Sequence, residues 1–337
     1  MKIELNSVSS IYKDIAKIKR VLENSGIVVR SVKLFKEGTL RATFKVITES
    51  TDYVVKLSSN LDIERVKLEI ENLKKISTVT DLAVCPLNAE PLIFGSKVGY
   101  YYKFFNGKML NHRCINNLYY RFGVVVGEFD NALKALPFNH QEQTQRLINH
   151  MTKINSLPID AIHSEDTLSL IKKGLTKINK EWSNIEVSNL RTQFIHKDLH
   201  FNNVLYNKNN DKFFIIDMAG LSVQFLAKEI SVIIGNEFIS RDVINFQIIS
   251  DIVNGYSDRV LLNEDEVRAI PIFVIEKKIG ELNFLQEQFN NGGITLRMYN
   301  KYKRLSTNNL REIIEKYNLI ASFLSKCYKD IKKQRYV

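Results

Sequence analysis

Four polar side chains in one segment have the types and the spacing that phosphoryl transfer requires. They are His196, Asp198, Asn203 and Asp217, and the apolar residues 213–216 precede the last of them. A carboxylate on a rigid loop, here Asp198, can accept or orient the proton of an attacking hydroxyl group. The amide oxygen of Asn203 and the carboxylate of Asp217 are hard oxygen ligands suited to Mg²⁺, which offsets the charge of the transferred group. The pattern therefore indicates transfer of a nucleotide γ-phosphate to a hydroxyl.

The two histidines near Asp198 are expected to support the loop. His196 should brace it through a backbone hydrogen bond. His200 could contact phosphate or substrate, and packing within the loop is an equal alternative. Asn and Asp are also common turn residues, so each polar position alone would suit an ordinary turn. Their joint spacing between apolar segments favours the catalytic interpretation.

Hydrophobic periodicity predicts a β-rich first part of the chain. Apolar residues spaced three and four apart predict helices, and alternating apolar residues between turn residues predict strands. By these rules, helices are expected over 8–24 and 63–76, and strands over 27–35, 42–48, 53–57, 92–94 and 98–105. This order predicts a small antiparallel sheet with one helix inserted after its third strand.

Helical periodicity dominates after the turn at Asn106-Gly107. Helices are expected over 118–136, 141–154 and 167–185, a short β-rich segment over 194–217, and a helical tail over 240–330 with breaks at Pro271 and at 290–293. We therefore expect two domains. Residues 1–106 should form an N-terminal nucleotide-binding lobe, and residues 107–337 a larger catalytic and acceptor-binding helical lobe.

Composition excludes several classes of protein. The 337 residues are 45% hydrophobic with only 14 Gly and 5 Pro, which argues against a disordered or low-complexity chain. Three widely separated cysteines argue against a disulfide framework or a zinc site. The start lacks a signal-like apolar stretch, and no window has the ~18 apolar residues of a membrane span, so a soluble cytoplasmic protein is expected.

The formal net charge of +11 is compatible with a polyanionic partner. Lysines occur along the whole chain, so we interpret much of the excess as a solvated surface. Nucleic acid is not favoured as a partner, because basic residues interleaved with stacking aromatics are not evident.

The motif His196-x-Asp198-x4-Asn203, followed by an apolar pair and Asp217, resembles the catalytic signature of the aminoglycoside phosphotransferase/choline kinase superfamily. The resemblance extends from about residue 27 to residue 235. It implies an α+β, bilobal protein-kinase-like fold, with a small antiparallel sheet and one helix in the N-lobe and a mainly helical C-lobe. It also implies ATP- or GTP-dependent, Mg²⁺-assisted phosphorylation of a small-molecule alcohol, such as an aminoglycoside, an amino alcohol or a sugar.

The same resemblance assigns nucleotide-binding roles in the first lobe. Lys56 matches the third-strand lysine that contacts the α- and β-phosphates, and Glu69 matches the helix glutamate that pairs with it. Glu71 is the alternative partner, but it points about 200° away around the helix. The turn over the phosphates offers Gly38 and Thr39. The hinge, whose backbone would bind an adenine edge, includes Phe104 and Phe105.

The chain departs from the family pattern at several positions. Lys197 stands where a small residue is usual, Asp217 has no second acid close behind it, and Lys228-Glu229-Ile230 replaces an Asp-Leu-Ala helix start. These departures keep open a second hypothesis, a non-catalytic scaffold of the spore-coat-associated type.

The acceptor is the least determined part of the hypothesis. Residues 243–337 contain 15 Lys and Arg against 11 Asp and Glu, which disfavours a highly cationic aminoglycoside. A local acidic patch at 264–266 could offset this charge, and Tyr299 and Tyr302 could line the pocket. The acceptor, the choice of ATP or GTP, the number of metal ions and the oligomeric state remain open.

Overall fold

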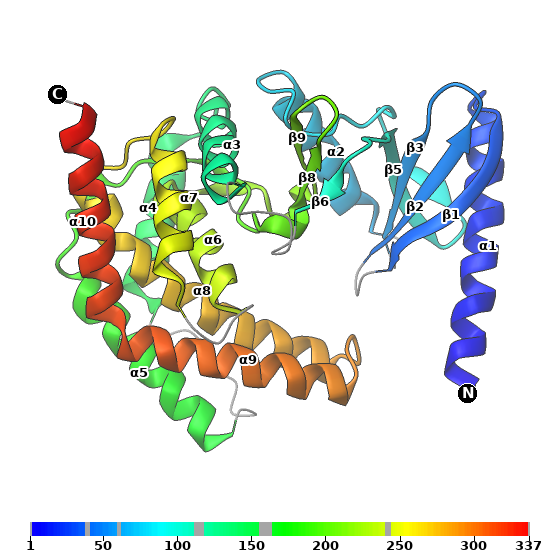
Figure 1. Cartoon of the computed structure of the whole chain (residues 1–337). Helices are drawn as coiled ribbons and strands as arrows, with labels where there is room; N and C mark the ends of the chain where they lie inside the picture. The colour runs from blue at the N-terminus through cyan, green and yellow to red at the C-terminus, as the bar shows by residue number, and fades with distance from the viewer. Residues whose placement is uncertain are drawn as a thin grey trace. The chain divides into compact units, whose positions relative to one another are not determined.

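The computed structural model of the chain describes residues 2–37, 41–58, 62–110, 118–154, 164–239 and 244–335 (Figure 1). The chain divides into two compact units. Unit 1 comprises residues 1–109 and 205–219, and unit 2 comprises residues 110–204 and 220–337.

A five-stranded antiparallel sheet is the centre of unit 1. Its strands are β1 (Val29–Glu37), β2 (Arg41–Thr48), β3 (Tyr53–Ser58), β4 (Leu92–Phe94) and β5 (Lys97–Lys103), in the order β1-β2-β3-β5-β4. Helix α2 (Ile63–Ser77) follows β3, as the periodicity predicts, and Asp62 caps it by accepting a hydrogen bond from the backbone of Arg65. The expected sheet with one inserted helix is confirmed.

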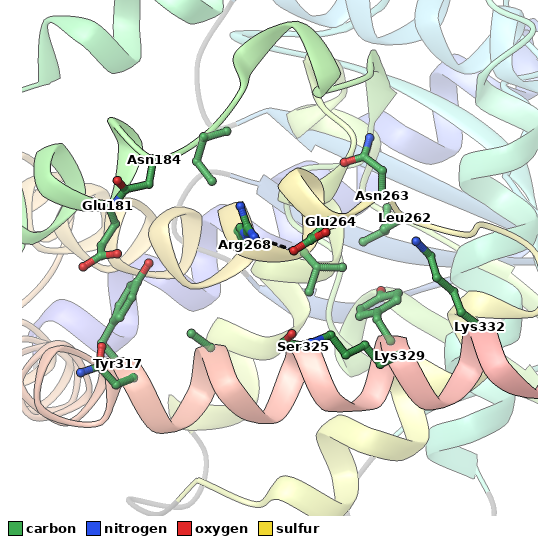
Figure 2. A pocket seen from close by; sticks show the side chains of 15 residues that line it. Glu181, Asn184, Leu262, Asn263, Glu264, Arg268, Tyr317, Ser325, Lys329 and Lys332 are labelled. Atoms are coloured by element: carbon green, nitrogen blue, oxygen red, sulfur yellow. Dashed lines mark hydrogen bonds and ion pairs between the residues drawn. The ribbon is translucent and has the colours of Figure 1, made fainter.

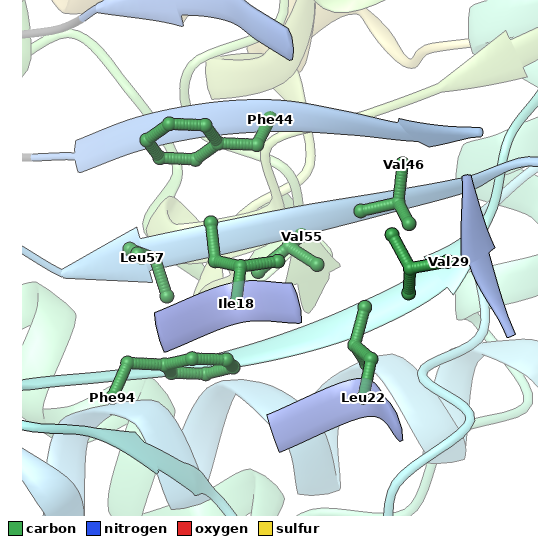
Figure 3. Close-up of a cluster of buried hydrophobic side chains, with 8 residues drawn as sticks. All are labelled: Ile18, Leu22, Val29, Phe44, Val46, Val55, Leu57 and Phe94. Atoms are coloured by element: carbon green, nitrogen blue, oxygen red, sulfur yellow. The ribbon is translucent and has the colours of Figure 1, made fainter. Parts of the chain in front are cut away.

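Helix α1 (Lys2–Asn24) covers this sheet (Figure 1). Its residues Ile18 and Leu22 lie one turn apart and are fully buried. They pack in one cluster with side chains of the sheet (Figure 3), namely Val29, Phe44, Val46, Val55, Leu57 and Phe94. This cluster is the core that holds β3, and therefore Lys56, in place.

A second, three-stranded sheet returns a late segment of the chain to unit 1. It is formed by β6 (Lys108–Met109), β8 (Val204–Asn207) and β9 (Lys212–Ile215) in the order β6-β8-β9. The backbone N–H of Ile215 donates to the carbonyl of Leu82, 2.7 Å away. Residue 217, which follows β9, therefore folds with β3 and α2.

Unit 2 is mainly helical. Its elements are α3 (Leu118–Leu133), α4 (His140–Thr152), α5 (Glu165–Trp182), α6 (Ala227–Ile239), α7 (Phe246–Ser257), α8 (Glu264–Asn290), α9 (Leu296–Glu315) and α10 (Tyr317–Arg335), with the antiparallel strands β7 (Thr192–Ile195) and β10 (Ser222–Phe225) and the short 3₁₀ turns Val187–Asn189 and Phe201–Asn203. A third 3₁₀ turn, Met218–Gly220, spans the boundary between the two units. Within the described ranges, no helix is long and apolar enough to cross a membrane.

Helices α3 and α7 lie side by side in Figure 1. Glycines permit this close approach. A methyl group on Gly123 would overlap the carbonyl oxygen of Ile252, and one on Gly255 would overlap the carbonyl oxygen of Tyr120. The backbones thus touch directly, which only glycine allows at both positions.

The expected break at Pro271 is wrong, because α8 continues through it. Proline lacks an N–H group and costs about 3 kcal/mol in a helix interior. The surrounding apolar side chains outweigh this cost, since Ile270, Ile272 and Phe273 are fully buried and each contributes about 1.5–3 kcal/mol. The expected break at 290–293 is confirmed between α8 and α9.

The core of unit 1 can be tested by shortening Leu22. We expect Leu22→Ala to destabilise the protein by about 2–5 kcal/mol, because the cavity removes contacts from a fully buried site. Urea unfolding followed by circular dichroism measures the change. Val28→Ala is the control, since Val28 is 70% exposed. Equal effects of the two substitutions would contradict this description of the core.

Candidate functional site

Lys56 is the centre of a buried ionic group in unit 1. Its Nζ lies 2.7 Å from Oδ1 of Asp217 and 3.5 Å from Oε1 of Glu69. Lys56 is 7% exposed and Glu69 is 4% exposed, so both charges are removed from water. An isolated buried charge is costly, and the two carboxylates offset that cost. The pairing also selects Glu69 over the exposed Glu71.

Tyrosines from β5 complete the surroundings of Glu69. The hydroxyl of Tyr100 donates to Glu69 Oε1 at 2.8 Å. Burial, and then the charges of Asp217 and Glu69, raise the pKa of Tyr102. Two carboxylates therefore face one ammonium, and their contacts orient the side chain of Lys56.

The segment proposed as a hinge has part of its backbone already engaged. The N–H of Phe104 donates to the carbonyl of Asp52, and the N–H of Gly107 donates to the carbonyl of Phe105. The ring of Phe105 stacks on Phe214 with centroids 4.0 Å apart. These contacts fix the path of the segment after β5. Hinge binding would have to use the backbone groups that remain.

The turn assigned to phosphate binding, Gly38 and Thr39, lies outside the described residues. The structure describes β1 as far as Glu37 and β2 from Arg41.

The loop after β7 carries the expected catalytic residues of unit 2. His196 is fully buried, and its Nδ1 accepts a hydrogen bond from the backbone N–H of Asp198 at 3.3 Å. This is the bracing contact expected for His196. The side-chain amide of Asn203 donates to the carbonyl of Asp198 at 2.8 Å, which orients its oxygen away from that bond. Asp198 itself is exposed.

His200 caps the short 3₁₀ turn Phe201–Asn203. Its Nδ1 accepts from the backbone N–H of Asn202 at 3.2 Å. Phe201, on the same turn, packs against Tyr119 and Phe122 of α3. The turn is thus anchored to the helical core, and Asn203 is held in a fixed position next to Val204.

Two residues in these loops adopt a left-handed backbone conformation. Lys197 has φ 68° and Asp217 has φ 69°, values that non-glycine residues seldom adopt. Such strain costs of order 1–3 kcal/mol and is concentrated at functional sites. Each strained residue directly precedes or carries a carboxylate that sequence analysis assigned to the chemistry.

Glu229 is a site residue that sequence analysis missed. It is fully buried at the start of α6, and its Oε2 accepts the backbone N–H of Lys197 at 3.1 Å. Burial raises the pKa of Glu229 to about 7, although hydrogen bonds from the backbone of Lys197 and His196 oppose the shift. The departure from Asp-Leu-Ala at this helix start was the signal available in the sequence: the acid is retained as the longer glutamate.

Asp130 of α3 lies behind the same loop. Tyr256 donates to its carboxylate at 2.8 Å, and Gln193 of β7 donates to its backbone carbonyl at 2.8 Å. Burial and the charge of Glu229 raise the pKa of Asp130 well above its ordinary range. The two buried acids, Asp130 and Glu229, therefore resist ionising together, and both support β7 and the loop that follows it.

The acidic segment 264–266 does not form an exposed acidic patch. Glu266 is fully buried, completes a capping box with Asn263 and binds Arg191, with Oε2 2.6 Å from the guanidinium. Glu264 pairs with Arg268. Glu266 therefore stabilises the start of α8 and joins it to Arg191, whereas Glu264 is exposed, so a role of this segment in offsetting acceptor charge stays a prediction.

The two tyrosines of α9 differ in environment. Tyr299 is buried, stacks on Phe289 with centroids 4.5 Å apart and donates to Gln286. Tyr302 is 41% exposed. Tyr299 is therefore part of the core, and only Tyr302 remains accessible to a ligand.

Unit 2 also contains a cavity of about 370 Å³ (Figure 2). Residues from the end of α5, the start of α8 and the length of α10 line it, including Glu181, Asn263, Arg268, Tyr317 and Lys332. None of the residues that sequence analysis assigned to the chemistry lines this cavity.

Glu229 gives a pH-dependent prediction. Its ordinary pKa is 4.5 and rises to about 7 in the folded protein, so folding stability should fall as the pH rises from about 4.5 to about 7. Glu229→Gln cannot ionise. Between pH 5 and pH 8, the stability of the variant should therefore gain on that of the wild type by an amount on the order of 3 kcal/mol.

Urea unfolding of both proteins at the two pH values measures this difference. Glu71→Gln is the control, because Glu71 is exposed on α2. A difference between wild type and Glu229→Gln that does not change with pH would show that Glu229 is ionised throughout.

Comparison with known proteins locates the fold but not the family. No model of a known protein family matches the chain, and no curated protein matches it. Solved structures do match. Amicoumacin kinase in complex with AMP-PNP, Ca²⁺ and Ami has 13% identity and a TM-score of 0.61, over 88% of this chain and 93% of that one.

Two further structures give similar values. The GDP complex of aminoglycoside 2'-phosphotransferase-IIIa has 13% identity and a TM-score of 0.60, over 88% of this chain and 96% of that one. The microcompartment-associated aminopropanol kinase has 11% identity and a TM-score of 0.61, over 86% and 93%. The chain therefore has the α+β, kinase-like fold of these small-molecule phosphotransferases, which confirms the fold class and the structural resemblance inferred from the sequence.

Proposed function

We propose that this protein is a small-molecule kinase, which transfers the γ-phosphoryl group of ATP or GTP to a hydroxyl of its acceptor. The observation that carries the proposal is the buried Lys56, whose ammonium is bound by Glu69 and Asp217 although 161 residues separate Lys56 from Asp217. A lysine so oriented can bind phosphate oxygens, and charged groups gathered in this way are frequent at functional sites.

The catalytic loop supports the second half of the proposal. Asp198 would accept or orient the proton of the acceptor hydroxyl. His196 holds its backbone at 3.3 Å and Glu229 holds the preceding peptide at 3.1 Å, so the backbone that carries the carboxylate is held before the acceptor binds. Fixed geometry is the main contribution that a protein makes to phosphoryl transfer.

Asn203 and Asp217 are the proposed oxygen ligands of Mg²⁺. The side-chain nitrogen of Asn203 is engaged by the carbonyl of Asp198, which leaves the amide oxygen as its donor atom for a cation. Among the described residues, no three His, Cys, Asp or Glu side chains are grouped as metal ligands. One amide oxygen and one carboxylate suit a cation that takes its other ligands from phosphate and water. When bound, that cation would neutralise the phosphate charge.

The similar structures support the choice of donor and acceptor class. Amicoumacin kinase was solved with AMP-PNP and Ca²⁺, and the aminoglycoside phosphotransferase with GDP. Residues 1–106 are then the proposed nucleotide-binding lobe and residues 107–337 the catalytic and acceptor-binding lobe. A nucleoside triphosphate donor also supports the cytoplasm as the location of the protein.

Asp198 provides the direct test of the catalytic proposal. We expect Asp198→Asn to lower kcat by about 10²–10⁴-fold, because the general base is lost, while nucleotide binding persists. Acceptor-stimulated release of ADP or GDP, screened over alcohols, amino alcohols, sugars and aminoglycosides, measures turnover. Asp166→Asn is the control, since Asp166 is exposed on α5. Unchanged turnover in Asp198→Asn would refute the role.

Lys56 provides an independent test that needs no acceptor. We expect Lys56→Met to weaken Mg²⁺-nucleotide binding by about 10–100-fold, because hydrogen bonds to charged groups contribute about 1.5–3 kcal/mol. Isothermal titration with ATP and GTP measures the affinity. Lys33→Met is the control, since Lys33 is exposed on β1. If the wild type binds neither nucleotide, the non-catalytic scaffold hypothesis is favoured instead.

A further inference from the structure

Lys197 is a cation next to the catalytic loop that the proposed mechanism does not use. It immediately precedes Asp198, and its backbone is fixed by Glu229 and by its left-handed conformation. Its side chain is exposed. Among the described residues, its ammonium has no hydrogen-bond or ion-pair partner.

Three further cations interact with Lys197, each from a different helix. Arg146 comes from α4, Lys228 from α6 and Lys277 from α8. Burial, and then the charges of Lys228, Arg146 and Lys277, lower the pKa of Lys197, while the charge of Glu276 opposes this shift. Each of the three cations is therefore close enough to Lys197 to repel its ammonium.

The available carboxylate is already engaged. Glu276 lies 2.7 Å from the ammonium of Lys228 and 3.2 Å from Nε2 of His150. Burial alone would raise the pKa of Glu276. The contacts with Lys228 and His150 outweigh this effect of burial and lower the pKa to about 2. Glu276 is thus an anion paired directly with Lys228, and its charge offsets that of Lys197 only in part.

A second carboxylate in the neighbourhood is shared between two lysines. Glu281 binds Lys277 at 3.1 Å and Lys278 at 2.9 Å, and Lys278 is fully buried. Five cationic residues, Arg146, Lys197, Lys228, Lys277 and Lys278, therefore stand against the two acids Glu276 and Glu281. Asp198 and the buried Glu229, which interacts with Lys277, reduce this excess of positive charge, and burial lowers the pKa of Lys278 to about 8.

These charges lie in the part of unit 2 that holds the catalytic loop. Asn236 of α6 donates to the carbonyl of Leu199, the residue after Asp198, at 3.4 Å. The adjoining Gly235 lies against the side chains of Lys277 and Lys278. Helix α6 thus joins the lysines of α8 to the segment that contains Asp198.

We infer that the acceptor is an alcohol that carries an anionic group, a carboxylate or a phosphate, and that Lys197, with Arg146 and Lys277 around it, binds that group. The inference rests on the proposed function. A hydroxyl in contact with Asp198 brings the rest of a small acceptor within reach of the adjacent Lys197. An anion there relieves the repulsion among the cations, whereas a polycationic acceptor would increase it.

The test uses alcohols that share one carbon skeleton and differ in charge. Glycerate and glycerol 1-phosphate are anionic, glycerol is neutral and 3-amino-1,2-propanediol is cationic. Their affinities are measured by isothermal titration against the full chain with ADP and Mg²⁺ present, and phosphate transfer to each is measured with ATP and with GTP. The proteins compared are wild type, Lys197→Glu, Lys197→Arg, Arg146→Glu and Lys172→Glu.

We expect the wild type to bind the anionic members at least about tenfold more tightly than the neutral and cationic ones. Lys197→Glu and Arg146→Glu should each abolish that preference, mainly through KM, while Lys197→Arg keeps it. Lys172→Glu makes the same change of charge at an exposed position on α5 and should have no effect. Both tested side chains are exposed, so the variants should fold.

The inference is overturned if the wild type shows no preference for the anionic members, if it prefers the cationic one, or if Lys172→Glu has the same effect as Lys197→Glu. Failure of the proposed function gives a different result, because the wild type would then neither bind Mg²⁺-nucleotide nor transfer phosphate to any acceptor. Transfer to a cationic alcohol would leave the kinase proposal intact and refute only the anionic acceptor.

Discussion

The ammonium of Lys56, buried between the carboxylates of Glu69 and Asp217, is the interaction on which the arrangement of unit 1 depends. A charge this deeply buried is tolerated only with partners at close range. One partner comes from the helix that follows the same strand, and the other comes from a segment 161 residues later. The requirement for pairing therefore explains why α2 must pack on the sheet and why the β8–β9 segment folds with the first part of the chain.

The loop of unit 2 that carries Asp198, the proposed catalytic loop, is held by a buried acid. Glu229 accepts the N–H of the left-handed Lys197, and Asp130, behind the loop, receives hydrogen bonds from Gln193 and Tyr256. Burial raises the pKa values of both acids, and the hydrogen bond to Glu229 helps to hold the left-handed residue before Asp198. Rigidity at Asp198 is thus built from the core outward. The cations that interact with Lys197 do not support the loop, and we infer that they bind a ligand instead.

Much of the fold could be predicted, because local patterns control it. The spacing of apolar residues located α2 within one residue of its observed end, and alternation located β2 and β3. The failures have tertiary causes. Pro271 stays within α8 because buried neighbours stabilise the helix around it, and Glu266 is buried by its contacts with Asn263 and Arg191. Neither outcome is visible in a local window, since each depends on a surface supplied by a distant segment.

The sequence by itself determined which chemistry is available, since the side-chain types of Asp198, Asn203, Asp217 and Lys56 and their order along the chain already indicate phosphoryl transfer. It also determined the elements that carry them, because hydrophobic periodicity is a local property. Only the tertiary structure decided which charges meet. It paired Lys56 with Glu69 rather than Glu71, and it placed Glu229 where its carboxylate accepts the backbone N–H of Lys197. Electrostatic energy depends on distance and burial in space, and separation along the chain specifies neither.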